Sequence, residues 1–147
     1  MIKFYKIADA HGYMSNFYKS NFFLYDKTWV TVEHAFQAQK TVDPVQYEEI
    51  HSAKTARLAR DLGQKVTLIP NWEDVKVQVM YECVLQKFSQ NQKIKELLLS
   101  TGSEELVEDS PVDWCWGCGA DGKGKNELGK ILVRVREELS KVKNPLM

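Results

Sequence analysis

The sequence lacks long apolar runs, contains few cysteines and carries no excess of charge of either sign. No stretch provides the roughly 18 consecutive apolar residues that a membrane span requires, and the first residues, MIKFYKIADAHGY, lack the apolar core of a secretory signal. Three cysteines (Cys83, Cys115 and Cys118) are too few for a disulfide scaffold. Lys plus Arg and Asp plus Glu both total 20, so no long-range field favours general binding to nucleic acids or anionic membranes. These absences favour a cytoplasmic protein without a membrane partner.

The length and composition of the chain favour one globular domain over residues 1–147. Two halves of this chain would each be too small for a secure hydrophobic core. Hydrophobic residues make up 44% and charged residues 27% of the sequence, which is typical of a globular protein.

Hydrophobic periodicity and turn residues predict a mostly helical chain with a small β-element. Residues 2–5 read as a strand, and Asn21 to Val32 as a hairpin that turns at Asp26–Lys27. Strands do not alternate with helices, so the expected class is α+β and not a doubly wound parallel sheet. Three expected helices follow the hairpin: residues 32–40 after the N-cap Thr31, residues 44–53 with Pro44 first, and residues 54–63 ending at a left-handed Gly63. A longer helix is expected over residues 71–88, with the apolar stripe Val75, Val79, Val84, Leu85 and Phe88. The last two cover residues 93–102, ending at Gly102, and residues 128–139, with the apolar face Leu128, Ile131, Leu132, Val135 and Leu139.

Residues 115–129 match the spacing of several known motifs but lack the surrounding strands and helices that those motifs need. Five of the eight glycines lie between residues 117 and 129, and three of them have G-x-G-x-x-G spacing. A dinucleotide fingerprint would need a preceding strand and a βαβ unit, and neither is predicted. Cys115 and Cys118 run into glycine instead of opening a helix, so they are interpreted as incidental, partly buried thiols. The glycines themselves fit either close approach to a ligand or a mobile surface turn.

A stronger pattern is the segment TVEHAFQAQK, residues 31–40. On a helix, Glu33, Gln37 and Lys40 stand at i, i+4 and i+7 and therefore share one face. Such a face is most often solvated. Phe36 and the aromatic hairpin instead suggest a helix packed into the domain, where buried polar groups need partners that a ligand can supply.

Two further segments combine polar groups with aromatic rings. In DWCWGCG, Asp113 precedes Trp114 and Trp116, so a carboxylate stands beside flat apolar rings that suit a base or a sugar. In HGYMSNF, Ser15 and Asn16 form a polar turn before Phe17. The structural alternative is that the tryptophans fill the core, that Asp113 caps a turn, and that HGYMSNF is only a turn.

Taken together, these segments resemble the NADAR family, also called YbiA-like. The resemblance runs in order through GYMSNFY, TVEHAFQAQK, W-x₆-VM, KF, LLLSTG, LVEDSP, DWCWGCG and KNELG, and covers about residues 4 to 136. It implies a YbiA-like α+β fold and N-glycosidase activity. Members of the family cleave early phosphoribosylamino-pyrimidine intermediates of riboflavin synthesis, and others remove ADP-ribose from guanine bases.

The resemblance also implies which residues take part. The matching positions are Glu33, Trp72, Asp113 and Trp116, with Lys40 implicated by the branch that reverses ADP-ribosylation. Cleavage of a ribosyl C–N bond builds positive charge on C1′ and needs a proton on the leaving nitrogen, and two carboxylates can meet both needs. We expect Glu33 to be the general acid–base and Asp113 to orient ribose or stabilise charge, although the two roles can be exchanged.

The remaining site residues are expected to bind the substrate. Trp116 and Trp72 are candidates for stacking on the base, although Trp72 lies at a helix start where a core role is also possible. Asn126 also suits the N-cap of the last helix, where backbone N–H groups attract anions. The candidate contacts to ribose or phosphate are Ser15, Asn16, Lys125 and Asn126, and Gln37 and Gly117 complete the substrate-binding set.

Lys40 has two possible roles. A lysine with the ordinary pKa of about 10.4 is protonated at neutral pH and is a poor nucleophile. Burial or a nearby cation would lower that pKa and allow Lys40 to form a Schiff base with a ring-opened C1′, whereas Glu33 would favour the charged amine. In the second role Lys40 only holds a phosphate or a hydroxyl group.

Three functions are therefore compatible with the sequence. The first is a glycosidase acting on a phosphoribosylamino-pyrimidine, the second a hydrolase of ADP-ribosylated guanine, and the third a binding module for NAD or ADP-ribose without turnover. The expected partner is a small phosphoribosyl or ADP-ribosyl substrate, with nucleic acid only as an ADP-ribosylated substrate. Both carboxylates and Lys40 favour an enzyme, and no metal or organic cofactor is expected. For catalysis to occur, the Glu33 helix and the Asp113 loop are expected to face one cleft.

Overall fold

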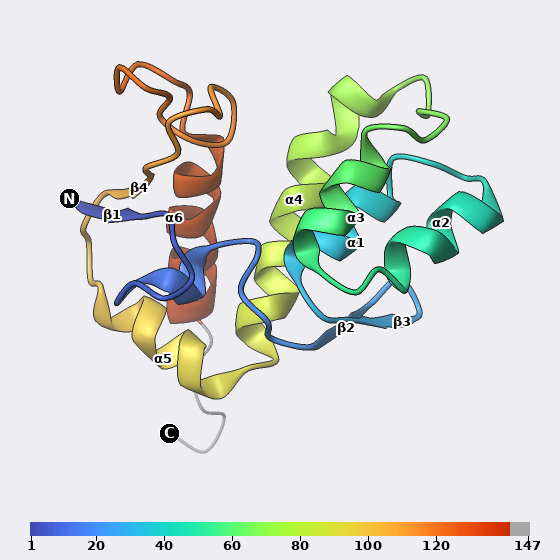
Figure 1. Ribbon diagram of the computed structural model, residues 1–147. Helices are drawn as coiled ribbons and strands as arrows, with labels where there is room; N and C mark the ends of the chain where they lie inside the picture. The colour runs from blue at the N-terminus through green and yellow to red at the C-terminus, as the bar shows by residue number, and fades with distance from the viewer. Residues whose placement is uncertain (142–147) are drawn as a thin grey trace. The chain divides into compact units, whose positions relative to one another are not determined.

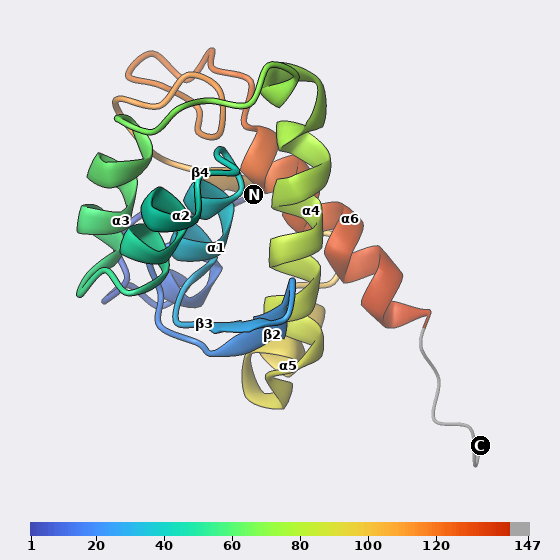
Figure 2. The same ribbon diagram turned by 90° about the vertical axis from the view of Figure 1, so that its right-hand side faces the viewer.

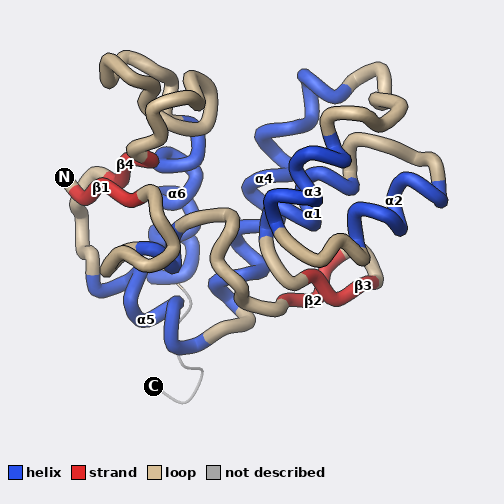
Figure 3. The backbone as a smooth tube through the Cα atoms, viewed as in Figure 1, coloured by secondary structure: helices blue, strands red, loops and turns tan. Residues whose placement is uncertain are grey.

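Six helices and two pairs of short strands make up the described chain, residues 1–141 of a computed structural model (Figures 1 and 3). The predominantly helical α+β class predicted from the sequence is confirmed. The chain packs into two compact units. Residues 16–87 form the first, which we call the hairpin unit. Residues 1–15 and the described residues from 88 onward form the second, the terminal unit. The single domain over residues 1–147 stays a prediction, and residues 142–147 lie outside the described part.

The hairpin predicted in the first unit is confirmed, but its turn lies one residue earlier than expected. Strands β2 (Phe22–Leu24) and β3 (Lys27–Trp29) pair antiparallel, with Leu24 opposite Lys27. The two loop residues are therefore Tyr25 and Asp26, with φ of 55° and 62°, as two-residue hairpin turns of this hand require. The Tyr25 hydroxyl donates a hydrogen bond to Glu82, and this contact fixes the tyrosine in a conformation that its residue type rarely adopts.

Local capping signals fix the starts of the next helices. Thr31 caps α1 (Val32–Ala38) by accepting a hydrogen bond from the His34 amide, and Asp43 caps α2 (Pro44–His51), which starts at the proline. Both starts agree with the sequence prediction. α1 packs against both α2 and α3 (Ala56–Gly63), and the three helices lie together in Figures 1 and 2.

The expected left-handed conformation of Gly63 is wrong. Gly63 is the last residue of α3, and the helix is followed by Gln64 in right-handed conformation. The residues that do have positive φ at glycine are Gly102, Gly119 and Gly122. The reason for a glycine at position 63 is space, because a Cβ atom there would lie 2.0 Å from Oε1 of Gln37.

α4 (Trp72–Ser89) starts near the predicted residue, but its buried face differs from the predicted stripe. Val75, Val79 and Leu85 are only half-buried. The inward face comprises Trp72, Met80, Cys83, Val84, Lys87 and Phe88. The predicted stripe includes Val84 and Phe88 of this face but misses the apolar Trp72, Met80 and Cys83 as well as Lys87, because contacts with other elements decide which side of α4 is buried.

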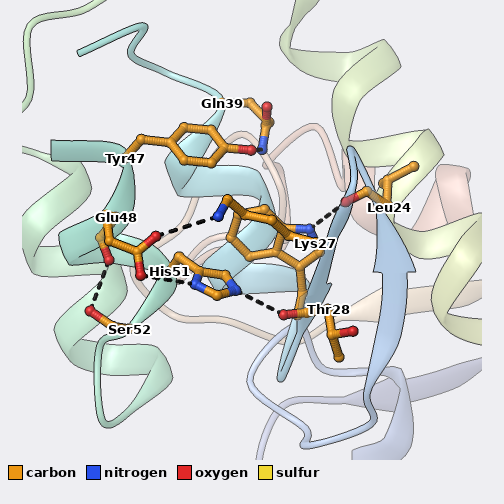
Figure 4. Close-up of polar contacts among 9 residues, drawn as sticks. Leu24, Lys27, Thr28, Gln39, Tyr47, Glu48, His51 and Ser52 are labelled. Atoms are coloured by element: carbon orange, nitrogen blue, oxygen red, sulfur yellow. Dashed lines mark hydrogen bonds and ion pairs between the residues drawn. The ribbon is translucent and has the colours of Figure 1, made fainter. Parts of the chain in front are cut away.

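A polar network joins α2 to the hairpin (Figure 4). Nε2 of His51 hydrogen-bonds to the Thr28 carbonyl at 2.9 Å, and its Nδ1 lies 3.4 Å from Glu48. Lys27 approaches the other oxygen of Glu48 at 3.5 Å. The His51 ring also packs edge-on against the fully buried Trp29 at 4.9 Å between ring centroids. These contacts attach α2 to strand β3 of the hairpin.

In the terminal unit, a strand near the N-terminus forms a parallel pair with a strand about a hundred residues later in the chain. β1 (Ile2–Phe4) pairs with β4 (Leu106–Glu108), with Ile2 opposite Leu106. β4 was not predicted, because three residues are too few to show alternation. The short helix η1 (Gly12–Met14) and α5 (Gln92–Ser100), which ends before the left-handed Gly102 as predicted, complete this part. The predicted apolar face of α6 (Glu127–Ser140) is buried throughout. No helix among residues 1–141 is long and apolar enough to cross a membrane.

Candidate active site

The buried polar stripe on α1 is the strongest feature of the hairpin unit. All seven residues of α1 are buried, and Glu33 exposes only 7% of its surface. Gln37, one turn later, donates a hydrogen bond from Nε2 to Oε1 of Glu33 at 2.8 Å. The sequence left open whether this face was solvated or packed, and it is packed. A buried carboxylate paired with a neutral amide is the arrangement expected for an acid–base group kept away from bulk water.

Lys40 lies just beyond α1 and interacts electrostatically with Glu33. Its backbone N–H donates to the Gln37 carbonyl, in the turn that closes the helix. Burial lowers the pKa of Lys40 from its ordinary value, and Lys76 lowers it further. The charges of Glu33 and Glu73 act in the opposite direction without reversing the shift. The net effect favours the neutral amine, the form that a nucleophilic lysine needs.

Asn16, which precedes the hairpin in the sequence, contacts the first turn of α1. Its carbonyl accepts a hydrogen bond from the Glu33 backbone N–H at 3.1 Å. Its side-chain Nδ2 lies 3.5 Å from the Met80 sulfur. Its Oδ1 is buried, and no donor in residues 1–141 reaches it. Asn16, Glu33, Gln37 and Lys40 thus lie along α1, from its first turn to the turn that follows its last residue.

Trp72 occupies the core of the hairpin unit. Its indole is only 5% exposed and packs against Phe36 with 5.0 Å between ring centroids. The sequence left a choice between stacking on a base and filling the core. The side chain takes the core position, so Trp116 is the stronger stacking candidate of the two.

Asp113 begins a tightly held loop in the terminal unit. Its Oδ1 accepts two backbone hydrogen bonds, from Cys115 at 3.0 Å and from Trp116 at 2.7 Å. Its own N–H donates to the hydroxyl of the buried Ser110. The carboxylate therefore caps the turn that carries Trp116, as one of the two sequence interpretations proposed. This capping fixes the orientation of Asp113 relative to Trp116.

The glycine-rich loop is held by a ladder of backbone hydrogen bonds. The carbonyls of residues 114–117 accept from the N–H groups of residues 125–128, at 2.8 to 3.1 Å. Gly117 packs tightly, because a Cβ there would lie 2.9 Å from Ser110 and 3.0 Å from the Glu108 carbonyl. Gly119, with φ of 71°, lies under the indole of Trp114. The glycines near the start of this loop thus serve close packing of the chain on itself.

This ladder corrects the expectation of an anion site at the start of α6. The first two helical N–H groups, of Glu127 and Leu128, already donate to the carbonyls of Cys115 and Trp116. Asn126 precedes the helix in a left-handed conformation and makes no side-chain cap. Its side chain instead bonds to the Glu108 N–H and the Leu106 carbonyl, which ties the loop to β4.

The other predicted contacts of the terminal unit differ in exposure. Trp116 and Ser15 are half-buried, and Lys125 is exposed. Trp114, which the sequence interpretation did not assign to the site, is 53% exposed with one side of its ring against Gly119. Cys115 and Cys118 are free thiols, half-buried and buried respectively, as predicted. Within residues 1–141, no group of three or more His, Cys, Asp or Glu side chains is arranged to hold a metal ion.

Sequence reasoning missed Lys87, a fully buried lysine on α4. Its pKa is lowered to about 7 because burial disfavours the charged ammonium group. Its Nζ lies 5.6 Å from the centre of the Tyr18 ring. The available signal was positional, since Lys87 follows Cys83 by one helical turn and directly precedes the buried Phe88.

The candidate residues divide between the two units. Asn16, Glu33, Gln37, Lys40 and Trp72 belong to the hairpin unit, and Ser15, Asp113, Trp116, Gly117, Lys125 and Asn126 belong to the terminal unit. Within the hairpin unit the structure brings Asn16, Glu33, Gln37 and Lys40 together. Within the terminal unit it brings together Asp113, Trp116 and Gly117. That the two sets serve one cleft remains a prediction.

Comparison with known proteins identifies the family of the chain. The model of the NADAR domain matches residues 3–140. The N-glycosidase Npun_R5314 of Nostoc punctiforme is 47% identical over 143 residues, which cover 94% of this chain and 92% of that protein. The riboflavin biosynthesis protein VVA0006 of Vibrio vulnificus is 42% identical over 94% of this chain but only 38% of its own length.

A solved structure shows the same fold. The NMR structure of the Escherichia coli protein YbiA has a TM-score of 0.89 and 39% identity, covering 99% of this chain and 90% of that chain. With a family model matched over nearly all of the described residues, a relative at 47% identity and a common fold, the chain belongs to the NADAR domain family and is an enzyme of its N-glycosidase class.

Proposed function

We propose that the protein hydrolyses the C–N bond between a phosphorylated ribose and a base-like amine, and that its substrate is an early phosphoribosylamino-pyrimidine of riboflavin synthesis. The observation that carries the proposal is the buried Glu33 carboxylate, which is hydrogen-bonded by Gln37 and electrostatically coupled to Lys40. The name of the Vibrio vulnificus relative, a riboflavin biosynthesis protein, supports this substrate class.

The reaction replaces one bond to C1′ by another. The C1′–N bond breaks, its electron pair stays on the nitrogen, and that nitrogen gains a proton. Water adds its oxygen to C1′ and loses a proton, which gives ribose 5-phosphate and an aminopyrimidine. Glu33 is suited to move these protons, because it is a carboxylate withdrawn from bulk water. Asp113 is suited to orient the ribose or to stabilise the positive charge that develops on C1′.

Other residues of the proposed site bind the substrate. The buried Oδ1 of Asn16 is suited to accept a hydrogen bond from a ribose hydroxyl, since no donor within residues 1–141 reaches it. Trp116 offers a ring for the pyrimidine, in a position fixed by Asp113. Lys125 is an exposed cation suited to the phosphate. The proposal includes no membrane partner.

Product analysis tests the proposal against its main alternative. Wild type and Glu33→Gln are incubated with a phosphoribosylamino-pyrimidine and, separately, with an ADP-ribosylated guanosine nucleotide, and products are separated by chromatography. We expect wild type to release ribose 5-phosphate from the first substrate and Glu33→Gln to do so at least about a hundredfold more slowly. If only the second substrate is cleaved, with release of ADP-ribose, the protein is a hydrolase of ADP-ribosylated guanine instead. Binding of ADP-ribose without any product would identify a binding module.

The same reaction mixtures distinguish the two roles of Lys40. Borohydride reduction during turnover converts a Schiff base between Lys40 and the ring-opened C1′ into a stable amine that mass mapping detects. Because burial lowers the pKa of Lys40, deprotonation for this step costs less than it does for an exposed lysine. An adduct on Lys40 supports the covalent route, and its absence supports direct hydrolysis with Lys40 as a binding group.

A further inference from the structure

The two polar atoms of the Gln37 side chain have different neighbours. Its Nε2 donates to Glu33 across one turn of α1 at 2.8 Å. Its Oε1 is buried and accepts no hydrogen bond from residues 1–141. That oxygen faces the α-carbon of Gly63 on α3, at the place where any other residue would carry its Cβ atom. Gln37 therefore lies between the Glu33 carboxylate and the surface of a neighbouring helix.

Gly63 is explained only by this contact. A helical glycine is less favourable than alanine, and Gly63, the last residue of α3, has neither positive φ nor a place beyond the helix end. A Cβ at position 63 would lie 2.0 Å from Oε1 of Gln37, 2.8 Å from its Cδ and 3.0 Å from its Cβ. The glycine thus provides the space that the amide of Gln37 occupies.

We propose that Gly63 and Gln37 are positioning residues for catalysis, through which α3 fixes the orientation of the Glu33 carboxylate. This inference rests on the proposed function of Glu33 as the acid–base group. With Oε1 against Gly63, the amide directs its N–H group toward Glu33. The opposite amide orientation would place two oxygens together, which is repulsive for an ionised carboxylate. The carboxylate is thereby held in one rotamer and in a constant electrostatic environment.

Two other titratable groups sense the Glu33 charge. Lys40 follows on the same segment, and the buried Cys83 faces it from α4, since the Glu33 charge contributes to the raised pKa of that thiol. Lys40 is in turn influenced by Lys76 and Glu73 on α4. Neither Gly63 nor Gln37 carries charge, so their substitution changes the position and hydrogen bonding of Glu33 without altering the net charge around it.

The substitution Gly63→Ala tests the proposal because stability and catalysis should respond differently. The new methyl group meets chiefly Oε1 and Cδ, the far end of the flexible Gln37 side chain, while the Gln37 Cβ lies 3.0 Å from it. The fold can accommodate the methyl group by moving the Gln37 amide and by a small shift between the two helices, and alanine favours the helix. We expect the melting temperature to change little and kcat for release of ribose 5-phosphate to fall about tenfold or more, with KM within about twofold. Gln37→Ala should show the same loss.

A double substitution shows whether the two residues act through one another. In a Gln37→Ala background the amide that the methyl group would displace is gone, and only the Cβ of residue 37, 3.0 Å away, remains beside it. Gly63→Ala should therefore cause little further loss of kcat. Ala59→Gly, on α3 one turn earlier, is the matched control. It lowers helix stability without filling space near Gln37, and it should leave kcat unchanged below its melting temperature. Losses that multiply in the double variant, or a Gly63→Ala enzyme with the wild-type kcat, would overturn the proposal.

Two further readouts distinguish positioning from a merely structural role. Loss of the donated hydrogen bond disfavours the ionised carboxylate, so the pH–rate limb that reports the acid–base group should move to higher pH in both single variants. The carbon NMR titration of the Glu33 carboxyl should move in the same direction, and this measurement needs no substrate. If wild type fails to release ribose 5-phosphate, the proposed function fails, while the titration still decides whether Gly63 and Gln37 control Glu33. An unchanged titration in both variants would refute that control.

Discussion

At the level of single residues, the carboxylate of Asp113 already has a structural task. Its Oδ1 accepts the backbone N–H groups of Cys115 and Trp116, so a change at this position alters the turn as well as the charge. The proposed chemistry needs the charge, whereas the turn needs only an acceptor oxygen. Asparagine retains that oxygen and alanine does not, which allows the two tasks to be separated.

We therefore expect Asp113→Asn and Asp113→Ala to differ in stability but not in activity. Asp113→Asn should keep the unfolding free energy close to wild type, and Asp113→Ala should lower it by about 1–2 kcal/mol through loss of two hydrogen bonds. Both should lower kcat about a hundredfold if the charge acts on the substrate. Urea unfolding and release of ribose 5-phosphate measure the two effects. Full activity in Asp113→Asn would restrict Asp113 to capping the turn.

The sequence identified much of the candidate site at this scale because spacing on a helix defines a face. Glu33 and Gln37 could be placed on one face of α1 from their separation alone, and their hydrogen bond agrees with it. The reason for Gly63 could not be found in the same way, because it depends on a contact between two helices. The role of the Asn126 side chain could not be predicted from the sequence either, since its hydrogen-bond partners in β4 lie 18 and 20 residues earlier.

At the level of elements, local signals predicted where helices begin more reliably than which faces they bury. Thr31 and Asp43 cap their helices with side-chain oxygens, and such caps depend on residues within one turn. The inward face of α4 depends on its neighbours, which place Lys87 inside and leave Val75 only half-buried. β4 depends on pairing with a strand about a hundred residues earlier. Long-range contacts therefore account for the elements that the sequence did not reveal.

The buried Lys87 should make the stability of the protein depend on pH. Its pKa is about 7 in the folded protein and 10.5 in its ordinary state. Below pH 7 both states carry the proton, and the full cost of burying the ammonium group opposes folding, on the order of 5 kcal/mol. Between pH 7 and about 10.5 the unfolded chain binds one proton more than the folded protein, so stability rises with pH.

Lys87→Met removes this dependence. We expect the variant to be more stable than wild type at pH 6, by several kcal/mol, and the difference to shrink as the pH approaches 10. Urea unfolding at intervals between pH 6 and pH 9.5 measures it. Lys93→Met, at an exposed position on α5, is the control and should follow wild type at every pH. A difference between Lys87→Met and wild type that stays constant with pH would contradict the assigned role of burial.

At the level of the whole molecule, the predicted function draws on residues from both units. The hairpin unit supplies the buried carboxylate and amine, and the terminal unit supplies the Asp113–Trp116 turn. An N-glycosidase needs the ribose, the base and the reacting bond bound at once. The prediction is that one substrate engages groups of both units.

NMR titration with ribose 5-phosphate, the expected product, tests this prediction. The side-chain amides of Asn16 and Gln37 should shift together with the backbone amides of residues 115–117, and all should follow one binding curve. The indole N–H of Trp29, which donates to the Leu24 carbonyl within the buried hairpin, is an internal control that should remain in place. Shifts confined to one unit would show that the other does not bind the phosphoribosyl group.

The hydrogen bonds between residues 114–117 and residues 125–128 divide the loop before α6 into an anchored stem and a tip. The tip, residues 120–123, is exposed and makes mainly local contacts, such as the Lys123 N–H to Asp121 and the Gly122 N–H to Gly119. Lengthening a surface loop costs little free energy once its ends are fixed. Insertions at residues 120–123 can therefore lengthen the exposed surface while Asp113 and Trp116 keep their places. Under the proposed function, we expect such insertions to alter substrate choice without disturbing the turn that carries Trp116.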